Sequence, residues 1–460
     1  MKKRRFSPYL LVMLSFLSGI LLGGFLLIIP FARVDNSWGN YVDGLFMATS
    51  AICVTGFDCY TDGLGNTLTL FGQCVELVCI QLGGLGFVTS LAFVITLFRK
   101  KISFNDRFYL SQATGSDSGP KVIKFIRELI LITFIFETVG TLLVLPAFIN
   151  MRGNVPMAYF NALFHTVSAF NNAGLDLFGG GTSLIRGVGN PYIDGMADWA
   201  YYYLCSVTMV LIILGGLSYL ALIEIFSFKK KPNQWSAHTK ICITMAFSLI
   251  AIGALLFLIT DRWVGKGDNK IGIFDAFFLS VTSRTAGFAT YNPYDLSSGG
   301  KVIDWILMFI GGGPLGTASG IKTTTIFVIL VAIFSYVRGR KVTAFHRSFS
   351  QTLIVKSMTV MLSSIFIIIT GFVVLSQFEA YNPAFRDSLG LYEVFSAFTN
   401  TGLSVGLVPT LSMGGKIVLV VLMYAGRLGP MTMFSLFSSH MHIDEDRIHV
   451  NYIEEDILIG

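Results

Sequence analysis

The chain has 460 residues, of which 53% are hydrophobic and only 13% are charged, and its formal net charge at pH 7 is +6. Apolar runs long enough to cross a bilayer return along the whole sequence, which excludes an ordinary soluble protein. The charge does not indicate nucleic-acid binding, because the basic residues stand in blocks between the apolar runs. The sequence therefore predicts a polytopic membrane protein.

The first apolar unit sets a design that the rest of the chain repeats. A spanning helix is predicted over 8–31, then a short apolar helix over 41–53, the sequence VTGF at 54–57, and a second spanning helix over 68–98. The short helix cannot cross a bilayer, so it must enter and return on the same side. Its loop then leaves non-helical backbone at membrane depth, which is tolerated only inside protein or around a water-filled cavity.

Three further units follow the same order, which gives eight spanning helices and four short helices in all. The further helices are predicted over 122–149, 157–171 and 199–228, then 241–260, 271–284 and 302–337, then 353–378, 388–399 and 416–439. The repeat units are predicted as 1–104, 105–232, 233–342 and 343–440, with 441–460 as a C-terminal tail.

One motif ends all four short helices. The endings read VTGF, NAGL, TAGF and NTGL, with glycines at Gly56, Gly174, Gly287 and Gly402, and an aromatic residue lies ten positions before each. Four such loops around one axis can aim carbonyl oxygens at a dehydrated cation. Ordinary helix C-caps also favour glycine, and they are the alternative. The predicted fold is all-α, with four helix–short helix–loop–helix units around a pseudo-four-fold central pore.

The helix predicted over 302–337 is too long for one crossing, since at about 1.5 Å per residue it would far exceed a hydrocarbon core of about 30 Å. It contains GGGPLGTASG at 311–320, which no helix would hold intact. We therefore expect an unwound loop in the conduction path below the glycine loops. A helix kinked at closely packed glycines is the alternative.

The basic blocks define the expected orientation. An even number of spans places both termini on one side, and the blocks within 2–5, 99–127, 229–240 and 338–356 fall on that side, which is therefore expected to be cytoplasmic. The glycine loops then lie toward the outside, where an excess of aspartate would raise the cation concentration at the mouth, although most of these residues are expected to be simply solvated. The expected location is the cell membrane.

The four loops, together with GGGPLGTASGIKTTT at 311–325 and YAGRLGPMT at 424–432, resemble the Trk/Ktr/HKT superfamily of potassium transporters over nearly the whole chain. The length and short termini are most similar to the bacterial Ktr membrane subunit. The resemblance implies a potassium selectivity filter formed by Val54, Thr55, Gly56, Asn172, Ala173, Gly174, Thr285, Ala286, Gly287, Asn400, Thr401 and Gly402. It also implies gating residues, namely Gly311, Gly312, Gly313, Gly316, Thr317, Ala318, Ser319, Gly320, Lys322 and Arg427.

The resemblance further implies what the chain works with. In that family a glycine in the first loop goes with potassium and a serine with sodium permeation, so Gly56 points to potassium. The chain itself is expected to bind no cofactor and no metal except potassium at the filter, with sodium as a candidate activator. ATP, ADP or NAD would act only through a cytoplasmic ring with RCK domains. Besides that ring, the expected partners are membrane lipid and a second copy of the chain, contacted through 441–460, and not nucleic acid.

Arg427 has two possible uses within the last spanning helix. It could face the pore below the glycine loops, where it would repel ions or bond the carbonyl groups of the loop at 311–320. It could instead form a structural salt bridge, with Glu76, Glu137 or Glu224 as its partner. A cation at this depth is costly unless it meets water or a partner, so one of the two uses must hold.

Arg284 departs from the pattern, because it lies three positions before Gly287 and would oppose potassium if it lined the path. We expect it to point behind the loop. There it would tie the short helix to the outer helix or to an acidic residue such as Asp275 or Asp304.

No GxxxxGK[ST] P-loop and no extended soluble domain is present, so we expect no enzyme activity and a driving force from the membrane potential or a coupled ion. The main alternative is a sodium-coupled or sodium-permeable transporter of the same superfamily. A membrane-embedded lipid-processing enzyme would need converging acidic or histidine groups, and the six histidines are scattered. A scaffold gives no reason for four glycine loops.

Overall fold

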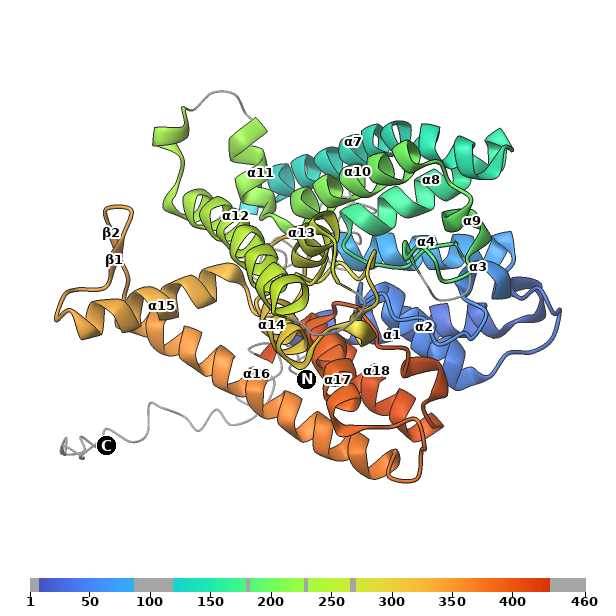
Figure 1. Cartoon of the computed structure of the whole chain (residues 1–460). Coiled ribbons are helices and arrows are strands. Elements are labelled where there is room, and N and C mark those ends of the chain that lie inside the picture. The colour runs from blue at the N-terminus through green and yellow to red at the C-terminus, as the bar shows by residue number, and fades with distance from the viewer. Residues whose placement is uncertain (1–7, 87–118, 179–182, 227–230, 265–269, 431–460) are drawn as a thin grey trace, which may run out of the picture.

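The structure is a computed structural model, and it describes residues 8–86, 119–178, 183–226, 231–264 and 270–430. These residues are mostly helical and form one bundle, in which the chain passes around a common centre (Figure 1). The predicted all-α class and the order of helices within the units are confirmed. The unit boundaries themselves remain predictions, and the tail at 441–460 lies outside the described residues.

The first two units form the blue and green half of Figure 1. The first contains α1 (Pro8–Ile28), η1 (Pro30–Ala32), α2 (Tyr41–Ile52), α3 (Leu64–Thr67) and α4 (Leu70–Leu85). The second contains α7 (Gly119–Arg152), α8 (Val155–Phe170), α9 (Pro191–Asp194), α10 (Asp198–Gly216) and α11 (Tyr219–Phe226). The predicted single span over 199–228 is therefore wrong, because Leu217 and Ser218 separate α10 from α11 after a pair of weakly helical glycines.

The third and fourth units form the yellow to red half. The third contains η2 (Pro232–Gln234), α12 (Ala237–Phe257), η3 (Leu258–Trp263), α13 (Ile273–Thr282), η4 (Pro293–Asp295), α14 (Ser298–Phe309) and α15 (Thr323–Val337). A hairpin of β1 (Thr343–Ala344) and β2 (Arg347–Ser348) follows, and then α16 (Gln351–Phe378), α17 (Asp387–Thr399), η5 (Val408–Thr410) and α18 (Met413–Leu428). The expected interruption at 311–320 is present, between α14 and α15.

Helix packing closes the four units into a circle. Each short helix, namely α2, α8, α13 and α17, packs against the first long helix of its own unit. The later helix of each unit also packs against the short helix of the next unit, in the pairs α4–α8, α10–α13, α14–α17 and α18–α2. The last pair joins the end of the chain to its beginning, so the short helices surround one axis.

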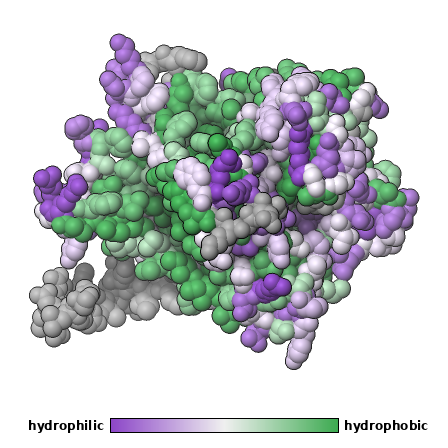
Figure 2. All heavy atoms as spheres, in the orientation of Figure 1, coloured by the Kyte–Doolittle hydropathy of each residue, from purple (hydrophilic) through white to green (hydrophobic). Residues whose placement is uncertain are grey.

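The short helices form the interior, and the long helices form an apolar exterior. Phe46, Phe164 and Tyr392, three of the aromatic residues ten positions before the glycines, are fully buried, whereas Phe277 is 43% exposed. Hydrophobic residues form a broad area to the left of the centre of the face in Figure 2. Four described helices are long and apolar enough to cross a membrane, over Lys124–Met151, Asp198–Gly216, Ala237–Trp263 and Gln351–Phe378. The helices predicted over 68–98 and 416–439 also end early, at Leu85 and Leu428, because Gly86 and Gly429 follow with positive φ angles of 79° and 77°. Most of the rest of both predicted spans lies outside the described residues.

Candidate functional site

Each short helix ends a few residues before its glycine. The final helical residues are Ile52, Phe170, Thr282 and Thr399. The last carbonyl groups of a helix lack partners within it and carry the negative end of its dipole. Four such ends around one axis favour a cation near the loops that follow them.

The four loops share one backbone conformation although their side chains differ. The glycines have positive φ angles of 103°, 70°, 86° and 80°, at Gly56, Gly174, Gly287 and Gly402. The residues two positions earlier are also left-handed, with φ of 58°, 58°, 68° and 52° at Val54, Asn172, Thr285 and Asn400. Non-glycine residues rarely adopt this region, and the strain persists only where the surroundings enforce it. The same surroundings therefore act on all four loops.

The loops meet in a closed ring, in the order of the chain. A Cβ atom added to Gly174 would lie 2.6 Å from the carbonyl oxygen of Ala286, and one added to Gly287 would lie 2.7 Å from that of Thr401. The other two glycines face carbonyl oxygens in the same way, Gly56 that of Ala173 and Gly402 that of Thr55. Only glycine fits at these places without displacing a carbonyl group. The ring thus brings together residues predicted for the filter from all four units.

A hydrogen bond between side chains adds to the closure of the ring. The hydroxyl group of Thr55 donates to the amide oxygen of Asn400 over 2.9 Å, and both residues are buried. This bond joins the first loop to the fourth, the two loops that are farthest apart in the sequence.

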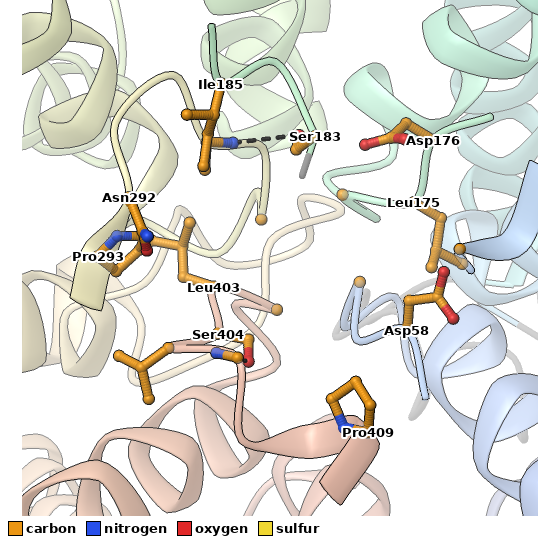
Figure 3. A pocket seen from close by; sticks show the side chains of 18 of the residues that line it. Asp58, Leu175, Asp176, Ser183, Ile185, Asn292, Pro293, Leu403, Ser404 and Pro409 are labelled. Carbon is orange, nitrogen blue, oxygen red and sulfur yellow. Dashed lines mark hydrogen bonds between the residues drawn. The ribbon is translucent and has the colours of Figure 1, made fainter. Parts of the chain in front are cut away.

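A cavity of about 390 Å³ opens on the far side of the ring from the short helices. All four glycines line it, and so do Asp58 and Asp176, each two positions after its glycine. Figure 3 shows the lining residues on four segments, with Asp58 on the blue, Asp176 on the green, Asn292 on the yellow and Ser404 on the red ribbon. The third and fourth units have Ala289 and Ser404 at the positions of the two aspartates, so the carboxyl groups lie on one side of the cavity.

Both aspartates lie in loops outside the membrane-spanning helices. Burial raises the pKa of Asp58 to about 7, and the nearby Asp176 carboxylate contributes to that rise. Burial likewise raises the pKa of Asp176 to about 6. The negative charge at this mouth therefore depends on pH between about 6 and 7.

Hydroxyl groups near the helix ends anchor two of the loops. Ser50 Oγ donates to the carbonyl oxygen of Phe57 over 2.8 Å and accepts from the amide of Gly56 over 3.2 Å. The third unit has Val281 at the position of Ser50. There the next residue, Thr282, donates to the carbonyl oxygen of Phe288 over 2.6 Å. The third loop thus keeps the anchor by moving the hydroxyl group one position along.

The segment 311–320 lies against the ring on the side of the short helices. The Thr317 hydroxyl group donates to the carbonyl oxygen of Phe170 at the end of α8, over 3.1 Å. The Ser319 amide donates to the hydroxyl group of Thr285, within the third glycine loop, over 3.2 Å. A movement of this segment would therefore break or shift a hydrogen bond to the third glycine loop.

The break in α10 supplies partners for the same segment. The amides of Gly313 and Thr317 donate to the carbonyl oxygens of Gly216 and Gly215, over 2.8 Å and 3.1 Å. The carbonyl groups that a continuous helix would have used internally are thus available to the loop. This exchange explains why the span predicted over 199–228 is interrupted.

Two basic side chains hold the segment 311–320. Arg427 donates to the carbonyl oxygen of Thr317 over 2.8 Å, to the Ser319 hydroxyl group over 2.9 Å, and to the carbonyl oxygen of Gly83 on α4. Lys322 donates to the carbonyl oxygen of Ala318 over 2.7 Å. Of its two expected uses, Arg427 makes the contact with the loop, and it joins that loop to the first unit.

The three glutamates considered as partners for Arg427 do not bond to it in the part of the chain that the structure describes. Glu137 accepts from Asn171 over 2.9 Å and from Gln81 over 3.2 Å, and Glu224 accepts from the hydroxyl groups of Ser236 and Thr239. Glu76 is fully buried and its carboxyl oxygens have no hydrogen-bond partner among the described residues.

Arg284 lies behind the third loop, as expected, but without the expected partner. It is 7% exposed and lines a small cavity with Asn172 and Gly312. Within the described ranges its side chain forms no ion pair with Asp275 or Asp304, and Asp304 instead accepts from the hydroxyl group of Tyr392 over 2.5 Å. Asp304 on α14 thus bonds to Tyr392 on α17 and joins the third unit to the fourth, instead of neutralising Arg284.

A second repeated motif, absent from the predictions above, packs the later helix against the short helix in three of the units. Gly83, Gly215 and Gly426 pack against carbonyl oxygens of short helices, those of Ile52, Phe170 and Phe398 respectively. The signal is visible in the sequence as LGGLG at 82–86, LGGLS at 214–218, IGGGP at 310–314 and AGRLG at 425–429. Arg427 therefore occupies a position at which the other three units have glycine.

Backbone oxygens are the ligands that this site offers. No group of three or more His, Cys, Asp or Glu side chains is placed to hold a metal ion in the described residues. Carbonyl oxygens around an axis suit a monovalent cation that passes through, since they replace its water without binding it as tightly as carboxylates would.

Comparisons with known proteins identify the family of the whole chain. The model of the TrkH family, described as "Cation transport protein", matches residues 26–446. The potassium/sodium uptake protein NtpJ of Enterococcus hirae is 33% identical, over 100% of this chain and 99% of its own length. The Ktr system potassium uptake protein B of Bacillus subtilis is 32% identical, over 99% and 97%. The crystal structure of the potassium transporter TrkH from Vibrio parahaemolyticus has the same fold, with a TM-score of 0.71 at 20% identity over 95% of this chain and 86% of its own.

A match of this extent, to a family model and to full-length relatives, settles the family. The matched family consists of cation transporters and not of enzymes. The chain belongs to the TrkH family of cation transport proteins.

Proposed function

We propose that the chain takes up potassium across the cell membrane, by passing the dehydrated ion through the ring of four glycine loops. One observation carries the proposal. In all four loops the residues at the same two positions are left-handed, and each glycine packs against a carbonyl oxygen of the neighbouring loop. Such a ring can replace the water shell of potassium. The relatives from Enterococcus hirae and Bacillus subtilis are named as potassium uptake proteins, which supports the same cargo.

A bacterium that lacks its own potassium uptake tests this proposal. Expression of the chain should restore growth at low external potassium and accelerate uptake of a rubidium tracer. Sodium uptake should stay much slower. If the chain is correctly inserted and still moves no potassium, alone or with a cytoplasmic regulatory subunit, the proposal fails.

The segment 311–320 is the proposed gate of this path. It contacts α8 and the third glycine loop, and Arg427 and Lys322 hold it by hydrogen bonds. Opening would require these hydrogen bonds to be exchanged for others, so the segment would be held in place by specific bonds and not only by its size. Deletion of 312–316 should leave a path that conducts without regulation, measured as uptake that no longer responds to a regulatory subunit.

A sodium-permeable or sodium-coupled transporter is the second candidate. The name of the Enterococcus hirae relative includes sodium, which is the observation that favours it. Gly56→Ser separates the two candidates, since a potassium-selective ring should lose its preference for potassium in this variant. A wild-type chain that already moves sodium as fast as potassium, or that needs sodium for uptake, would support the second candidate.

Two partners complete the proposal. The basic segments on the side expected to face the cytoplasm, such as 229–240, offer positive charge to a nucleotide-binding ring, and the tail at 441–460 would contact a second copy of the chain. ATP, ADP or NAD would then act through the ring alone. Mass measurement of the purified protein in detergent, with and without the tail, tests the dimer independently of transport.

A further inference from the structure

The joint between the third and fourth units forms an arm that projects from the bundle. It consists of α15, the β1–β2 hairpin and α16, at the left of Figure 1. The hairpin is packed back on the arm: the Phe345 ring stacks on Phe327 with centroids 6.2 Å apart, and the Phe349 amide donates to the carbonyl oxygen of Val342 over 3.0 Å. The arm is therefore a built structure and not a loose connection.

A groove of about 660 Å³ lies in this arm, between the end of α15, the base of the hairpin and the start of α16. None of the residues in the ring or in the segment 311–320 lines it. Its bed is apolar, with Ile333, Ile354 and Met358 among the lining residues, and Tyr336 at its edge is 88% exposed. The groove is thus a separate site with a surface suited to hydrocarbon.

Positive charge without a counterpart lies at one end of the groove. Arg340 and Lys341 line it, and both are exposed. From Thr323 to Phe378 the sequence has five basic residues and no acidic one, so no carboxylate of the arm itself can neutralise them. No ion pair of either residue is found in the described part of the chain. The purple residues at the left margin of Figure 2 mark this end of the molecule.

The groove lies where the membrane surface must pass. The 28 residues of α16 extend about 42 Å at about 1.5 Å per residue, which exceeds a hydrocarbon core of about 30 Å, so its first turns lie in the headgroup layer. Basic and tyrosine side chains at such a boundary rest on apolar surface and extend their polar ends to the headgroups. On the side assigned to the cytoplasm by the basic blocks, the leaflet is rich in anionic lipid.

We propose that this groove binds one anionic phospholipid, with an acyl chain along Ile333, Ile354 and Met358 and the phosphate group at Arg340 and Lys341. A cytoplasmic protein would match the charged rim alone, whereas the bed of the groove is apolar. A phospholipid satisfies both parts of the groove at once. The site goes beyond the proposed ion path, although α15 begins directly after the segment 311–320, so an occupied groove would fix the helix that carries this segment.

Native mass spectrometry of the purified full-length protein tests the site, with phosphatidylglycerol and phosphatidylcholine of the same acyl chains as probes. The protein should retain phosphatidylglycerol in preference. The double variant Arg340→Gln, Lys341→Gln should bind it about 30-fold more weakly, since each basic residue near an anionic surface contributes about fivefold in affinity. Phosphatidylcholine should bind the wild type and the variant alike.

Arg347→Gln is the matched control, because this exposed basic residue lies on β2 and does not line the groove. This variant should keep phosphatidylglycerol binding. Free glycerophosphoglycerol should not compete with the lipid, because it lacks the acyl chains. Equal binding of the two lipids, or unchanged phosphatidylglycerol binding in the double variant, would overturn the proposal. So would a cysteine at position 340 that forms a disulfide with a second copy of the chain, or loss of only a protein partner in the double variant.

Discussion

The ring of glycine loops is the same in all four units, whereas the layer beside it, formed by the ends of the later helices and the segment 311–320, differs between units. In the ring, four different sequences adopt one backbone conformation, and each loop faces the next in the same way. In the layer at the ends of the later helices, three units have glycine where the fourth has Arg427, and the third unit contributes the segment 311–320. The ring repeats one arrangement in all four units, whereas the layer beside it holds the segment 311–320 through Arg427 and Lys322. Ion preference and control should therefore respond to different substitutions.

The largest effect is expected from Gly402→Ser, which changes one of the four glycines of the ring. The new Cβ atom would displace the carbonyl oxygen of Thr55, and backbone strain at positive φ adds an expected cost of about 1–3 kcal/mol. Potassium uptake should fall at least about tenfold, with loss of the preference over sodium. Tracer uptake of both ions measures it.

Gly406→Ser is the control for that variant, because Gly406 also has a positive φ, of 84°, but no atom lies within 4 Å of the added Cβ. Its ion preference should stay that of the wild type. If both variants lose selectivity equally, general strain in the loop, rather than the ring, determines the preference.

Arg427→Gln should produce the next largest effect, and it should change control without changing preference. Hydrogen bonds to a charged group contribute about 1.5–3 kcal/mol each, and this variant weakens three of them. Basal potassium uptake should rise about fivefold or more, with the ratio of potassium to sodium unchanged. A lower uptake with an altered ratio would place Arg427 in the selective layer instead.

Lys416→Gln controls for the loss of a cation on the same helix. Lys416 pairs with Asp43 over 2.7 Å at the other end of α18 and lies away from the segment 311–320. This variant should lower the thermal stability slightly and leave basal uptake unaltered.

A smaller effect is expected inside the symmetric layer, where the loops have equal shapes but unequal anchors. Ser50→Ala removes two hydrogen bonds of the first loop, and a net contribution of about 1 kcal/mol each predicts a loss of potassium preference of about fivefold or more. Ser396 is equivalent in the fourth unit, but its hydroxyl group has no partner among the described residues. Ser396→Ala should therefore change the preference less than twofold, and equal effects in competition uptake would contradict this difference.

The smallest effect concerns the mouth, where acidic residues occupy one side only. Because their pKa values are raised, Asp58 and Asp176 are charged above about pH 7 and neutral below about pH 6. Uptake from low external potassium should fall about twofold from pH 8 to pH 6, as attraction of the cation weakens. Asp58→Asn should flatten this profile, and saturating potassium should abolish it. A profile that is unchanged in the variant would assign the pH dependence elsewhere.

Repetition explains how much of this architecture the sequence could predict. The short helices, the four loops and the break at 311–320 depend on local features, namely length, periodicity and glycine, which sequence patterns report well. The break at Leu217 depends on a partner 100 residues away, the segment that takes the freed carbonyl oxygens, and no local pattern reports that. The glycine pairs at 83–84 and 215–216 repeat and could have been found in the sequence. They are hard to notice because glycine is common in apolar helices.

Charged residues were the hardest to place. For Arg427, bonding of the carbonyl groups of 311–320 was one of two predicted uses, and it is observed at Thr317. Its further bond to Gly83 of the first unit was not predicted, because a search for partners among charged residues favours glutamates. For Arg284 the same reasoning expected an acidic partner, and Asp304 instead bonds to Tyr392. Hydrogen-bond partners at membrane depth follow from how the units meet, and that information is not local.

The position of Arg427 also has a consequence for the way the protein is encoded. In an assembly of four identical subunits, every substitution appears four times, and an arginine at this level would bring four like charges around a narrow axis, where they repel strongly. Joining the four units in one polypeptide removes that constraint, since each copy can mutate independently. A duplicated and fused gene can therefore keep one ring of four equivalent loops while it places Arg427 and the segment 311–320 in one unit each.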